Sequence, residues 1–420
     1  MMEMDCKMIN LERLEKEIVE VSKFGKLPDR GITRLAYSVE EKEARDYVKA
    51  LMVDIGMEIR EDAVGNIFGK INGTEDLTSV TSGSHLDSVP LGGYYDGTLG
   101  VMCALEAIRS IKENNIAHKR PLELIIFSCE ESSRFNMATM GSKVITGKLD
   151  LEKIKELKDK NNISIYEAAK DFGCDVDNLE SAKLKKDEFY SYIELHIEQG
   201  PVLENKEIPV GIVTGIASPI RYELTITGRA DHSGATPMSM RKDALVCASK
   251  ITIGVEEIAS NKAGDTVVAT VGFANAIPGV LNVIPGKVTL GIDIRDINKD
   301  NLIKASDLIR KLIDDTVKED NLSYELKEIS KDYPTTLNKE IIEVIEEESN
   351  NLGIKSMRLP SGAGHDAMHM VKVSKYTGMI FIPCKEGISH NVAEEVNMDD
   401  VYKATKVLAT SLVNLANRVD

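Results

Sequence analysis

The sequence lacks the features that mark membrane-spanning and secreted proteins. No run of apolar residues approaches the roughly 18 that a transmembrane helix needs, and the acidic, amphipathic segment 1–20 is unlike a signal peptide. The six cysteines include no CxxC pair, which is typical of thiols in a reducing compartment. We therefore expect a cytoplasmic protein without a membrane partner. The cysteines, mostly expected in the core, are Cys6, Cys103, Cys129, Cys174, Cys247 and Cys384.

The sequence also lacks an excess of positive charge. The chain has 52 lysine and arginine residues against 68 aspartate and glutamate residues, which gives a formal net charge of -16. Nucleic acids and anionic membranes bind clusters of lysine and arginine, so neither is an expected partner. The 420 residues exceed what one hydrophobic core usually holds, and 42% of them are hydrophobic. Two domains are therefore expected.

The first two hundred residues alternate between apolar segments of strand length and amphipathic segments of helix length. This alternation predicts an α/β domain with a central sheet flanked by helices, and it returns after residue 331. The predicted strands are 79–84, 122–128, 190–196 and 379–383, and the predicted helices are 39–55, 99–114, 339–350 and 398–417, with short helices in 150–187.

The segment 215–330 has a different order of elements, βαββαβ, which predicts an inserted α+β unit. The catalytic domain is then expected to comprise 1–214 and 331–420. Thr236 and Pro237 are read as the N-cap and first residue of a helix that runs to residue 260. The other predicted elements are strands at 221–227, 266–273, 287–295 and 322–329, a loop at 275–286 and a helix at 299–318.

Histidine and acidic residues gather where predicted strands end. His85 and Asp87 follow one strand, the pair Glu130 and Glu131 follows a second, and His196 ends a third. The carboxyl ends of strands in an open α/β sheet form the ligand crevice, so these residues can assemble one metal site. Imidazole and carboxylate suit zinc, and also manganese, cobalt or nickel.

Motifs spread over nearly the whole chain make the sequence similar to a known family. They are 84–90 (SHLDSVP), 92–97 (GGYYDG), 130–135 (EESSRF), 195–204 (LHIEQGPVLE), 234–238 (GATPM), 282–286 (NVIPG), 361–367 (SGAGHDA) and 388–390 (ISH). The sequence resembles the dinuclear zinc amidohydrolases of the aminoacylase and carboxypeptidase superfamily. Within it, the resemblance is to the branch of N-carbamoyl-L-amino acid hydrolase, allantoate amidohydrolase and β-ureidopropionase.

The resemblance implies a metallopeptidase-like catalytic domain that binds two divalent metal ions, most simply zinc. His85, Asp96 and His196 would bind one ion, while Asp96, Glu131 and His390 would bind the other. Asp87 would orient the imidazole of His85.

Catalytic roles follow from the same resemblance. Glu130 would be the general base toward a water between the metals. His232, on the inserted lid and dimerisation domain, would stabilise the oxyanion in the site of a partner subunit, which implies a homodimer.

The expected substrate is a small N-carbamoyl or ureido carboxylate. Asn282 and Arg295 resemble the branch's carboxylate-binding pair, and a guanidinium suits a planar carboxylate. Gln199 would contact the ureido end, and Gly362 or Gly364 could offer backbone donors. His365, Asp366 and His369 are expected to order a loop rather than bind a third metal, and His118 is expected at the surface.

The leading hypothesis is hydrolysis of N-carbamoyl-L-amino acids to amino acid, carbon dioxide and ammonia. Allantoate amidohydrolase and β-ureidopropionase activities are alternatives within the branch. More distant alternatives are an aminoacylase or dipeptidase, and a non-catalytic metal-binding dimer. Departures from the branch pattern at Ser218-Pro219, Ser132-Ser133 and Asn391-Val392 leave every expected ligand in place, and they are expected to reshape the substrate pocket.

Overall fold

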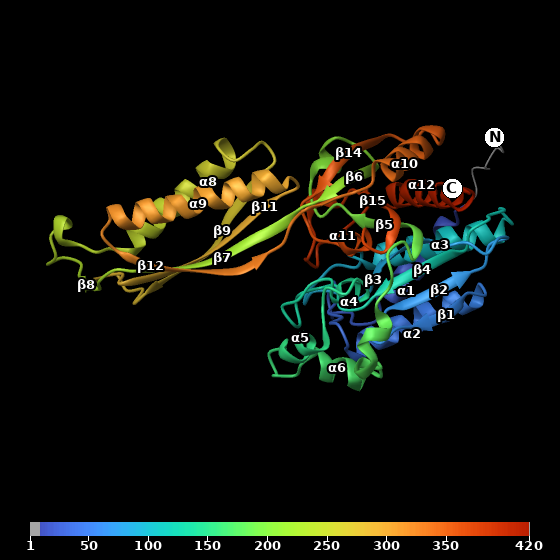
Figure 1. Cartoon of the computed structure of the whole chain (residues 1–420), viewed down its shortest axis with the longest axis horizontal. Coiled ribbons are helices and arrows are strands. Elements are labelled where there is room, and N and C mark those ends of the chain that lie inside the picture. The colour runs from blue at the N-terminus through green and yellow to red at the C-terminus, as the bar shows by residue number, and fades with distance from the viewer. Residues whose placement is uncertain (1–8, 420) are drawn as a thin grey trace. The chain divides into compact units, whose positions relative to one another are not determined.

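The computed structural model describes residues 9–419, which form two compact units (Figure 1). The first unit comprises the chain up to Thr214, Leu337–Leu359 and the chain from Gly364 onward, and the second comprises Gly215–Thr336 with Pro360–Ala363. The second unit continues past residue 331 because β13 (Thr335–Thr336) pairs with Gly215 and Ile216.

The first unit is built on a mixed sheet of strand order β1-β2-β4-β3-β5-β15-β6, with β14 also paired to β6. The four strands β4 (Leu122–Phe127), β3 (Val80–His85), β5 (Phe189–Ile197) and β15 (Ser374–Ile382) are parallel neighbours. Their carboxyl ends therefore lie along one edge of the sheet. The flanking strands are β1 (Glu58–Glu61), β2 (Ile67–Ile71), β6 (Val210–Ile216) and β14 (Ser356–Ser361).

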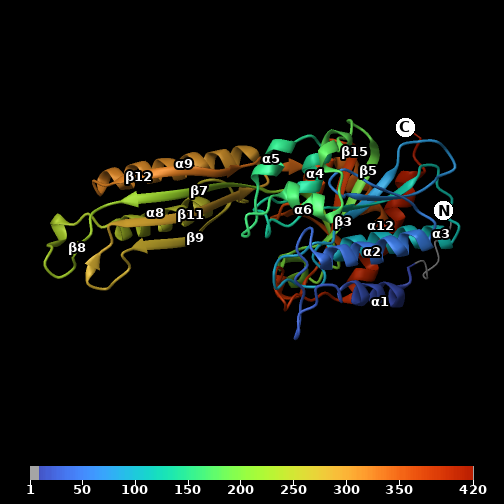
Figure 2. The same cartoon turned by 90° about the horizontal axis from the view of Figure 1, so that it is seen from below.

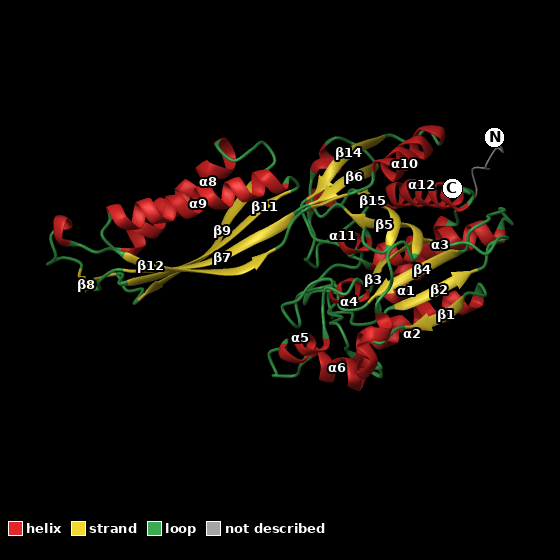
Figure 3. Cartoon of the chain, in the orientation of Figure 1, coloured by secondary structure: helices red, strands yellow, loops and turns green. Residues whose placement is uncertain are grey.

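Every residue of β3, β4 and β5 is buried, because helices cover both faces of this sheet. The helix α3 (Thr98–Glu113) packs on β3 and β5 and contacts α12 (Met398–Ala416), and Figure 3 shows how the helices surround the strands. The remaining helices of the unit are α1 (Leu11–Val21), α2 (Val39–Asp54), α4 (Met140–Ile145), α5 (Leu151–Glu156), α6 (Ile165–Phe172), α7 (Val202–Asn205), α10 (Lys339–Asn351) and α11 (Ala367–Met370).

The second unit is a four-stranded antiparallel sheet of order β12-β7-β11-β9, with α8 and α9 packed on one face (Figure 2). Alternate residues of β7 and β11 are buried, as expected for a sheet covered on one side. The predicted βαββαβ order is confirmed. Its elements are β7 (Ser218–Thr227), α8 (Ala244–Asn261), β9 (Val268–Ile277), β11 (Lys287–Asp296), α9 (Lys299–Glu319) and β12 (Ser323–Lys331). Two further short strands, β8 (Asp231–His232) and β10 (Val283–Ile284), form a separate two-stranded sheet.

The predicted start of α8 is wrong. Thr236 and Pro237 precede a short 3-10 turn, Met238–Met240, and the helix begins only at Ala244. The reason is that the side chain of Asp243 accepts hydrogen bonds from the backbone N–H groups of the helix's second and third residues, which makes Asp243 the N-cap.

The described cysteines agree with the expectation that most of them lie in the core. The five described cysteines are free thiols, all buried except the half-buried Cys174, and Cys6 lies outside the described residues. Within residues 9–419, no helix combines the length and the apolar character that crossing a bilayer requires.

Candidate functional site

Ligand-type side chains meet at the carboxyl edge of the parallel strands, in two groups that share Asp96. His85, Asp96 and His196 form one group, and Asp96, Glu131 and His390 form the other, with the ligand atoms of each group within 4.8 Å of one another. His85 ends β3, His196 lies near the end of β5, and the other three residues lie in loops that follow β3, β4 and β15. The order of the strands thus brings these loops together.

Asp96 presents one carboxylate oxygen to each group. Its Oδ1 lies 3.1 Å from Nε2 of His196 and 3.9 Å from Nε2 of His85. Its Oδ2 lies 3.0 Å from Nε2 of His390, which in turn lies 3.3 Å from Oε1 of Glu131. This is the geometry that a bridging ligand between two ions requires.

Backbone carbonyls set the tautomers of two of these histidines. Nδ1 of His85 donates to the carbonyl of Asp87 at 3.0 Å, and Nδ1 of His196 donates to the carbonyl of Ile197 at 3.0 Å. Because each Nδ1 is used in this way, Nε2 is the nitrogen of each ring that faces Asp96 and that can bind a metal ion. Both rings are thus prepared to act as ligands.

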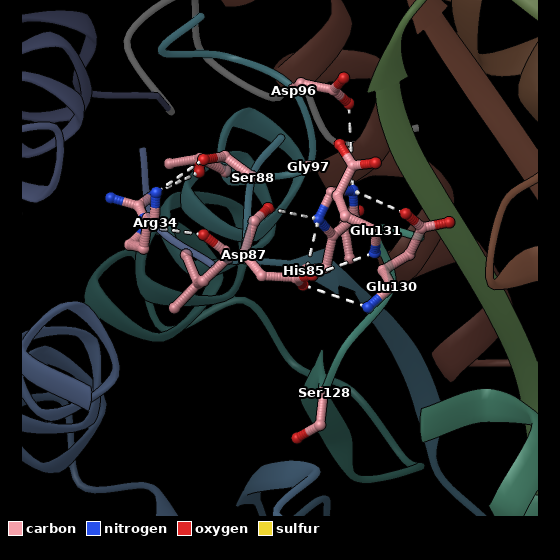
Figure 4. A network of polar contacts seen from close by, with 12 residues as sticks. Arg34, His85, Asp87, Ser88, Asp96, Gly97, Ser128, Glu130 and Glu131 are labelled. Atoms are coloured by element: carbon pink, nitrogen blue, oxygen red, sulfur yellow. Dashed lines mark hydrogen bonds and ion pairs between the residues drawn. The ribbon is translucent and has the colours of Figure 1, made fainter. Parts of the chain in front are cut away.

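The carboxylate of Asp87 holds the acidic pair by its backbone (Figure 4). Its Oδ1 accepts from the N–H of Glu130 at 3.2 Å, and its Oδ2 accepts from the N–H of Glu131 at 3.0 Å. The same carboxylate lies 3.6 Å from the ring of His85. Asp87 therefore connects the loop after β3 to the loop after β4, in addition to its expected place beside His85.

A buried arginine that the sequence reading did not single out supports the same loop (Figure 4). The guanidinium of Arg34 is fully buried, and its Nε donates to the carbonyl of Leu86 at 2.6 Å while Nη2 donates to Oγ1 of Thr98 at 2.7 Å.

Gly97, the residue before Thr98, has φ of +62°, and a Cβ there would lie 2.3 Å from the ring of His85. Glycine is required at this position because a side chain would displace the imidazole.

Burial and neighbouring charges shift the pKa values of these groups strongly. Burial raises the pKa of Glu130 well above its ordinary value, and Glu131 adds to the shift. Burial would also raise the pKa of Asp96, but hydrogen bonds from His196 and His390 hold it well below its ordinary value. Hydrogen bonds to Asp96 and Glu131 raise the pKa of His390 to about 11. Such a concentration of interacting titratable groups is typical of a functional site.

The donor set fits two divalent ions. One group offers two imidazoles and a carboxylate, the other one imidazole and two carboxylates, and these donors suit zinc, manganese, cobalt or nickel. Glu130 belongs to neither group, although its Oε2 lies 3.7 Å from Nε2 of His85. One buried carboxylate is thus left beside the ligands without being one of them.

His365, Asp366 and His369 are buried but point to different partners. The ring of His365 packs against that of His196 at 4.6 Å between centroids, and it forms a third possible ligand group with Glu194 and His196. Asp366 accepts from Oγ of Ser142 at 2.5 Å.

His369 and Glu194 complete the surroundings of this loop. Nε2 of His369 lies 2.9 Å from Oγ1 of Thr139, and Nδ1 lies 2.9 Å from Nζ of Lys148. Glu194 accepts from Oγ of Ser84 and from the N–H of Ala367. Sequence reasoning missed Glu194, although it stands two residues before His196 in a strand and so faces the same side.

His118 is half-buried rather than at the surface, and its Nδ1 donates to the carbonyl of Arg120.

Gln199 lies among the ligands of the second group. Its Nε2 donates to Oδ2 of Asp96 at 3.0 Å and to Oγ of Ser389 at 3.3 Å. Its Oε1 is buried without a hydrogen-bond partner. A buried acceptor of this kind is stabilised when a donor reaches it.

His232 and Asn282 lie next to each other in the second unit. His232 pairs with Val283, and the N–H of Ser233 donates to the carbonyl of Asn282 at 3.1 Å. Nδ1 of the exposed His232 ring accepts from the N–H groups of Gly234 and Ala235 at 3.1 Å each, so the ring proton is on Nε2. The ring therefore presents an N–H donor to its surroundings.

Arg295 lies at the other end of the second unit. It stands next to the end of β11, whereas Asn282 precedes the start of that strand, and the eight residue-to-residue steps from Lys287 to Arg295 span about 27 Å. Arg295 donates to both carboxylate oxygens of Asp293 and to the carbonyl of Gly362. The expected pairing of Asn282 with Arg295 therefore does not form within one chain. Gly364 belongs to the first unit and is exposed.

Comparisons with known proteins agree over the whole length of the chain. The model of peptidase family M20/M25/M40 matches residues 82–414. An uncharacterized hydrolase of Haemophilus influenzae is 42% identical, covering 97% of this chain and 99% of its own. An N-carbamoyl-L-amino acid amidohydrolase of Geobacillus stearothermophilus is 38% identical, covering 97% and 99%. A ureidoglycolate hydrolase of rice, Oryza sativa subsp. japonica, is 37% identical, covering 97% and 85%.

A solved structure agrees as well. A hydantoinase/carbamoylase family amidase from Burkholderia multivorans superposes with a TM-score of 0.92 at 32% identity, covering 98% of this chain and 99% of its own. The fold and the site thus define a metal-dependent hydrolase. The chain belongs to peptidase family M20/M25/M40, in the hydantoinase/carbamoylase branch that contains N-carbamoyl-L-amino acid amidohydrolases, allantoate amidohydrolases and ureidoglycolate hydrolases. It is an amidohydrolase of carbon–nitrogen bonds other than peptide bonds.

Proposed function

We propose that the protein hydrolyses the carbamoyl C–N bond of N-carbamoyl-L-amino acids, releasing amino acid, carbon dioxide and ammonia. The observation that carries the proposal is the non-ligating Glu130 beside two ligand groups that share Asp96. Similarity to N-carbamoyl-L-amino acid amidohydrolases over nearly the whole chain supports the choice of substrate.

Glu130 acts as the general base and then as the acid. Two divalent ions, when bound by the two ligand groups, supply Lewis-acid polarisation of the scissile carbonyl and lower the pKa of water. Glu130 takes the proton of the attacking water and returns it to the leaving nitrogen. Its buried surroundings, which raise its pKa, make the carboxyl group a better proton acceptor than an exposed glutamate.

Residues of the second unit bind the oxyanion and the carboxylate. The Nε2–H of His232 is a donor suited to the tetrahedral oxyanion. Arg295, with Gly362 held beside it, binds the substrate carboxylate through its planar guanidinium. Gln199 accepts from the ureido N–H groups through its unpartnered Oε1, and the backbone of Gly364 donates to the same substrate.

A homodimer is required for one substrate to reach both Asn282 and Arg295. Arg295 lies near the end of β11 and Asn282 precedes its start, and the strand spans about 27 Å from Lys287 to Arg295, whereas a small ureido carboxylate is far shorter. A site that uses Arg295 of one chain with His232 and Asn282 of its partner meets this requirement. The edge strand β9 exposes Val268, Phe273 and Ile277, which supports pairing of this unit with a second copy.

We propose a cytoplasmic location for the protein. Free thiols at all five described cysteines support it.

Allantoate and ureidoglycolate are the alternative substrates, because each combines a carboxylate with a ureido group and the branch includes enzymes named for both. The test is ammonia release by metal-reconstituted protein offered N-carbamoyl-L-amino acids, β-ureidopropionate, allantoate and ureidoglycolate in parallel. N-acetyl amino acids and dipeptides serve as controls and are assayed by amine release. A higher kcat/KM for the carbamoyl amino acids supports the proposal. A preference for allantoate or ureidoglycolate replaces it, and amine release from dipeptides alone overturns it.

A further inference from the structure

We infer that Glu394 is a positioning residue that sets the place of Asp96 relative to His390, and so the affinity of the second ligand group for its ion. The inference rests on the proposed metal centre, but it concerns a residue outside both ligand groups. Glu394 is fully buried, and it lies 298 residues from Asp96 along the chain. It follows His390 by four residues, in the same loop after β15.

The carboxylate of Glu394 connects the two loops directly. Its Oε1 accepts from the backbone N–H of Tyr95 at 2.8 Å and from that of Asp96 at 3.1 Å. Its Oε2 accepts from Oγ of Ser389, the residue before His390, at 3.2 Å. One side chain therefore binds the backbone of the bridging aspartate and the loop that carries a ligand of the second ion.

Gly93 shows that this loop is shaped around the carboxylate. A Cβ at Gly93 would lie 2.2 Å from Oε1 of Glu394 and 2.4 Å from its Cβ. Any other residue at position 93 would therefore displace the carboxylate or the loop. The second glycine of the motif, Gly93, thus has a structural reason that is independent of the ligands.

Ser389 extends the connection to the carboxylate of Asp96. Its Oγ lies 3.1 Å from Oδ2 of Asp96 and 3.2 Å from Oε2 of Glu394, and it accepts from Nε2 of Gln199 at 3.3 Å. A hydroxyl has one proton, which here faces two carboxylate oxygens. Asp96 is therefore held at its backbone N–H by Glu394 and at its Oδ2 by Ser389.

This arrangement matters because Asp96 serves both ligand groups. A bridging carboxylate must keep each oxygen at ligand distance from a different ion, and its Oδ2 is already 3.0 Å from Nε2 of His390. Residues that hydrogen-bond to ligands tune metal affinity, and their loss typically weakens it by about 10- to 100-fold. Loss of Glu394 is expected to affect the ion at Glu131 and His390 most, because Glu394 connects the loop of Asp96 to the loop of His390, and His390 is a ligand of the second group alone.

Calorimetric titration of the metal-free protein with Zn²⁺ alone tests the inference. Wild-type protein is expected to bind two ions per chain, and the His390→Ala variant identifies the step that belongs to the second group. Glu394→Ala should weaken that step by about 10- to 100-fold and leave the other step nearly unchanged. Glu394→Gln should have a smaller effect, because its amide oxygen can still accept from the two N–H groups.

The neighbouring Glu395 is the matched control. Its side chain is 46% exposed and forms long ion pairs, 3.5 Å each, with Arg30 and Lys385, so Glu395→Ala should titrate like wild type. Equal titrations of Glu394→Ala and Glu395→Ala overturn the inference. Parallel weakening of both steps, with a lower melting temperature of the metal-free protein, assigns Glu394 a general structural role and also overturns it.

A second variant keeps the test decisive if Glu394→Ala does not fold. Ser389→Ala removes only the hydroxyl that reaches Asp96 and Glu394, and it should weaken the same step. Unchanged titrations of both Ser389→Ala and Glu394→Gln overturn the inference. Wild-type protein that binds no zinc rejects the proposed metal centre itself, which is a different result from a wild-type-like variant.

Discussion

Asp87 accepts a hydrogen bond from the backbone N–H of Glu130, the residue proposed as general base, at 3.2 Å. The other oxygen of the same carboxylate accepts from the N–H of Glu131. The two side chains of the acidic pair are thus directed by one neighbour, although only Glu131 belongs to a ligand group. This shared support makes it possible to separate their roles by substitution, because neither change removes a backbone donor to Asp87.

Glu130→Gln should abolish most turnover while leaving metal binding intact. A glutamine cannot take a proton from water, and the loss of a general base typically lowers kcat by about 10²- to 10⁴-fold. Glu131→Gln removes a ligand of the second group and should release one ion per chain. Steady-state kinetics together with metal content by mass spectrometry checks both. Wild-type turnover by Glu130→Gln would reject its role as the base.

Removal of metal should abolish activity reversibly and lower stability. The ligands of both groups are buried carboxylates and imidazoles, except for the half-exposed His390, and bound ions stabilise the folded state through their affinity for it. Dialysis against a chelator should therefore lower the melting temperature, and added zinc or manganese should restore both the melting temperature and turnover. Full activity of demonstrably metal-free protein would contradict the proposed mechanism.

Mixing two inactive variants tests whether His232 serves a partner's site. A His232→Ala chain retains Glu130, and a Glu130→Gln chain retains His232. If the lid acts on the neighbouring subunit, each mixed dimer has one complete site, and random exchange of an equal mixture restores about a quarter of wild-type activity. The measurement is turnover after mixing under conditions that allow subunit exchange.

The control for that experiment is the double variant with both changes on one chain, mixed with Glu130→Gln. Such mixed dimers contain no site with Glu130, so they should remain inactive. Recovery only in the first mixture supports a shared site. A wild-type-like rate from the His232→Ala variant alone would show instead that this side chain is dispensable.

Asp366 should make the metal-free protein less stable as the pH rises. Burial, followed by the charge of Glu194, raises the pKa of Asp366 from 3.8 to about 8, so the folded state holds the proton more strongly than the unfolded state. Below about pH 4 both states are protonated, and between about 4 and 8 the unfolded state gains by ionising. The neutral Asp366→Asn variant should therefore become more stable than wild type across this window.

Melting temperatures of both proteins at several pH values measure this difference. It should grow from near zero at pH 4 and become constant above about pH 8. Asp54→Asn, an exposed substitution at the end of α2, is the control and should show no such trend. A difference that does not change with pH would show that Asp366 ionises alike in both states.

Local patterns predicted the fold class and placed His85, Glu131 and His196 near one another, whereas Asp96 and His390 were expected as ligands from the resemblance to the family. Strand candidates were recognisable because parallel strands buried on both faces read as apolar runs, and His85, Glu131 and His196 stand where those runs end. Helix starts were less predictable. Thr236 and Asp243 are both good capping residues, and the chain uses Asp243, a choice that depends on the turn that precedes α8.

The chemistry of the site was thus determined by the sequence alone, since ligand identity and position at a strand end are local properties. The supports of the site were decided only by the tertiary structure. Arg34 and Glu394 reach the site loops from distant parts of the chain, and nothing in their neighbouring residues indicates which backbone groups they will bind. The separation of Asn282 from Arg295 is likewise set by the length and register of β11. Long-range hydrogen bonds and strand pairing depend on how segments meet in space, and that physical relationship is absent from any local pattern.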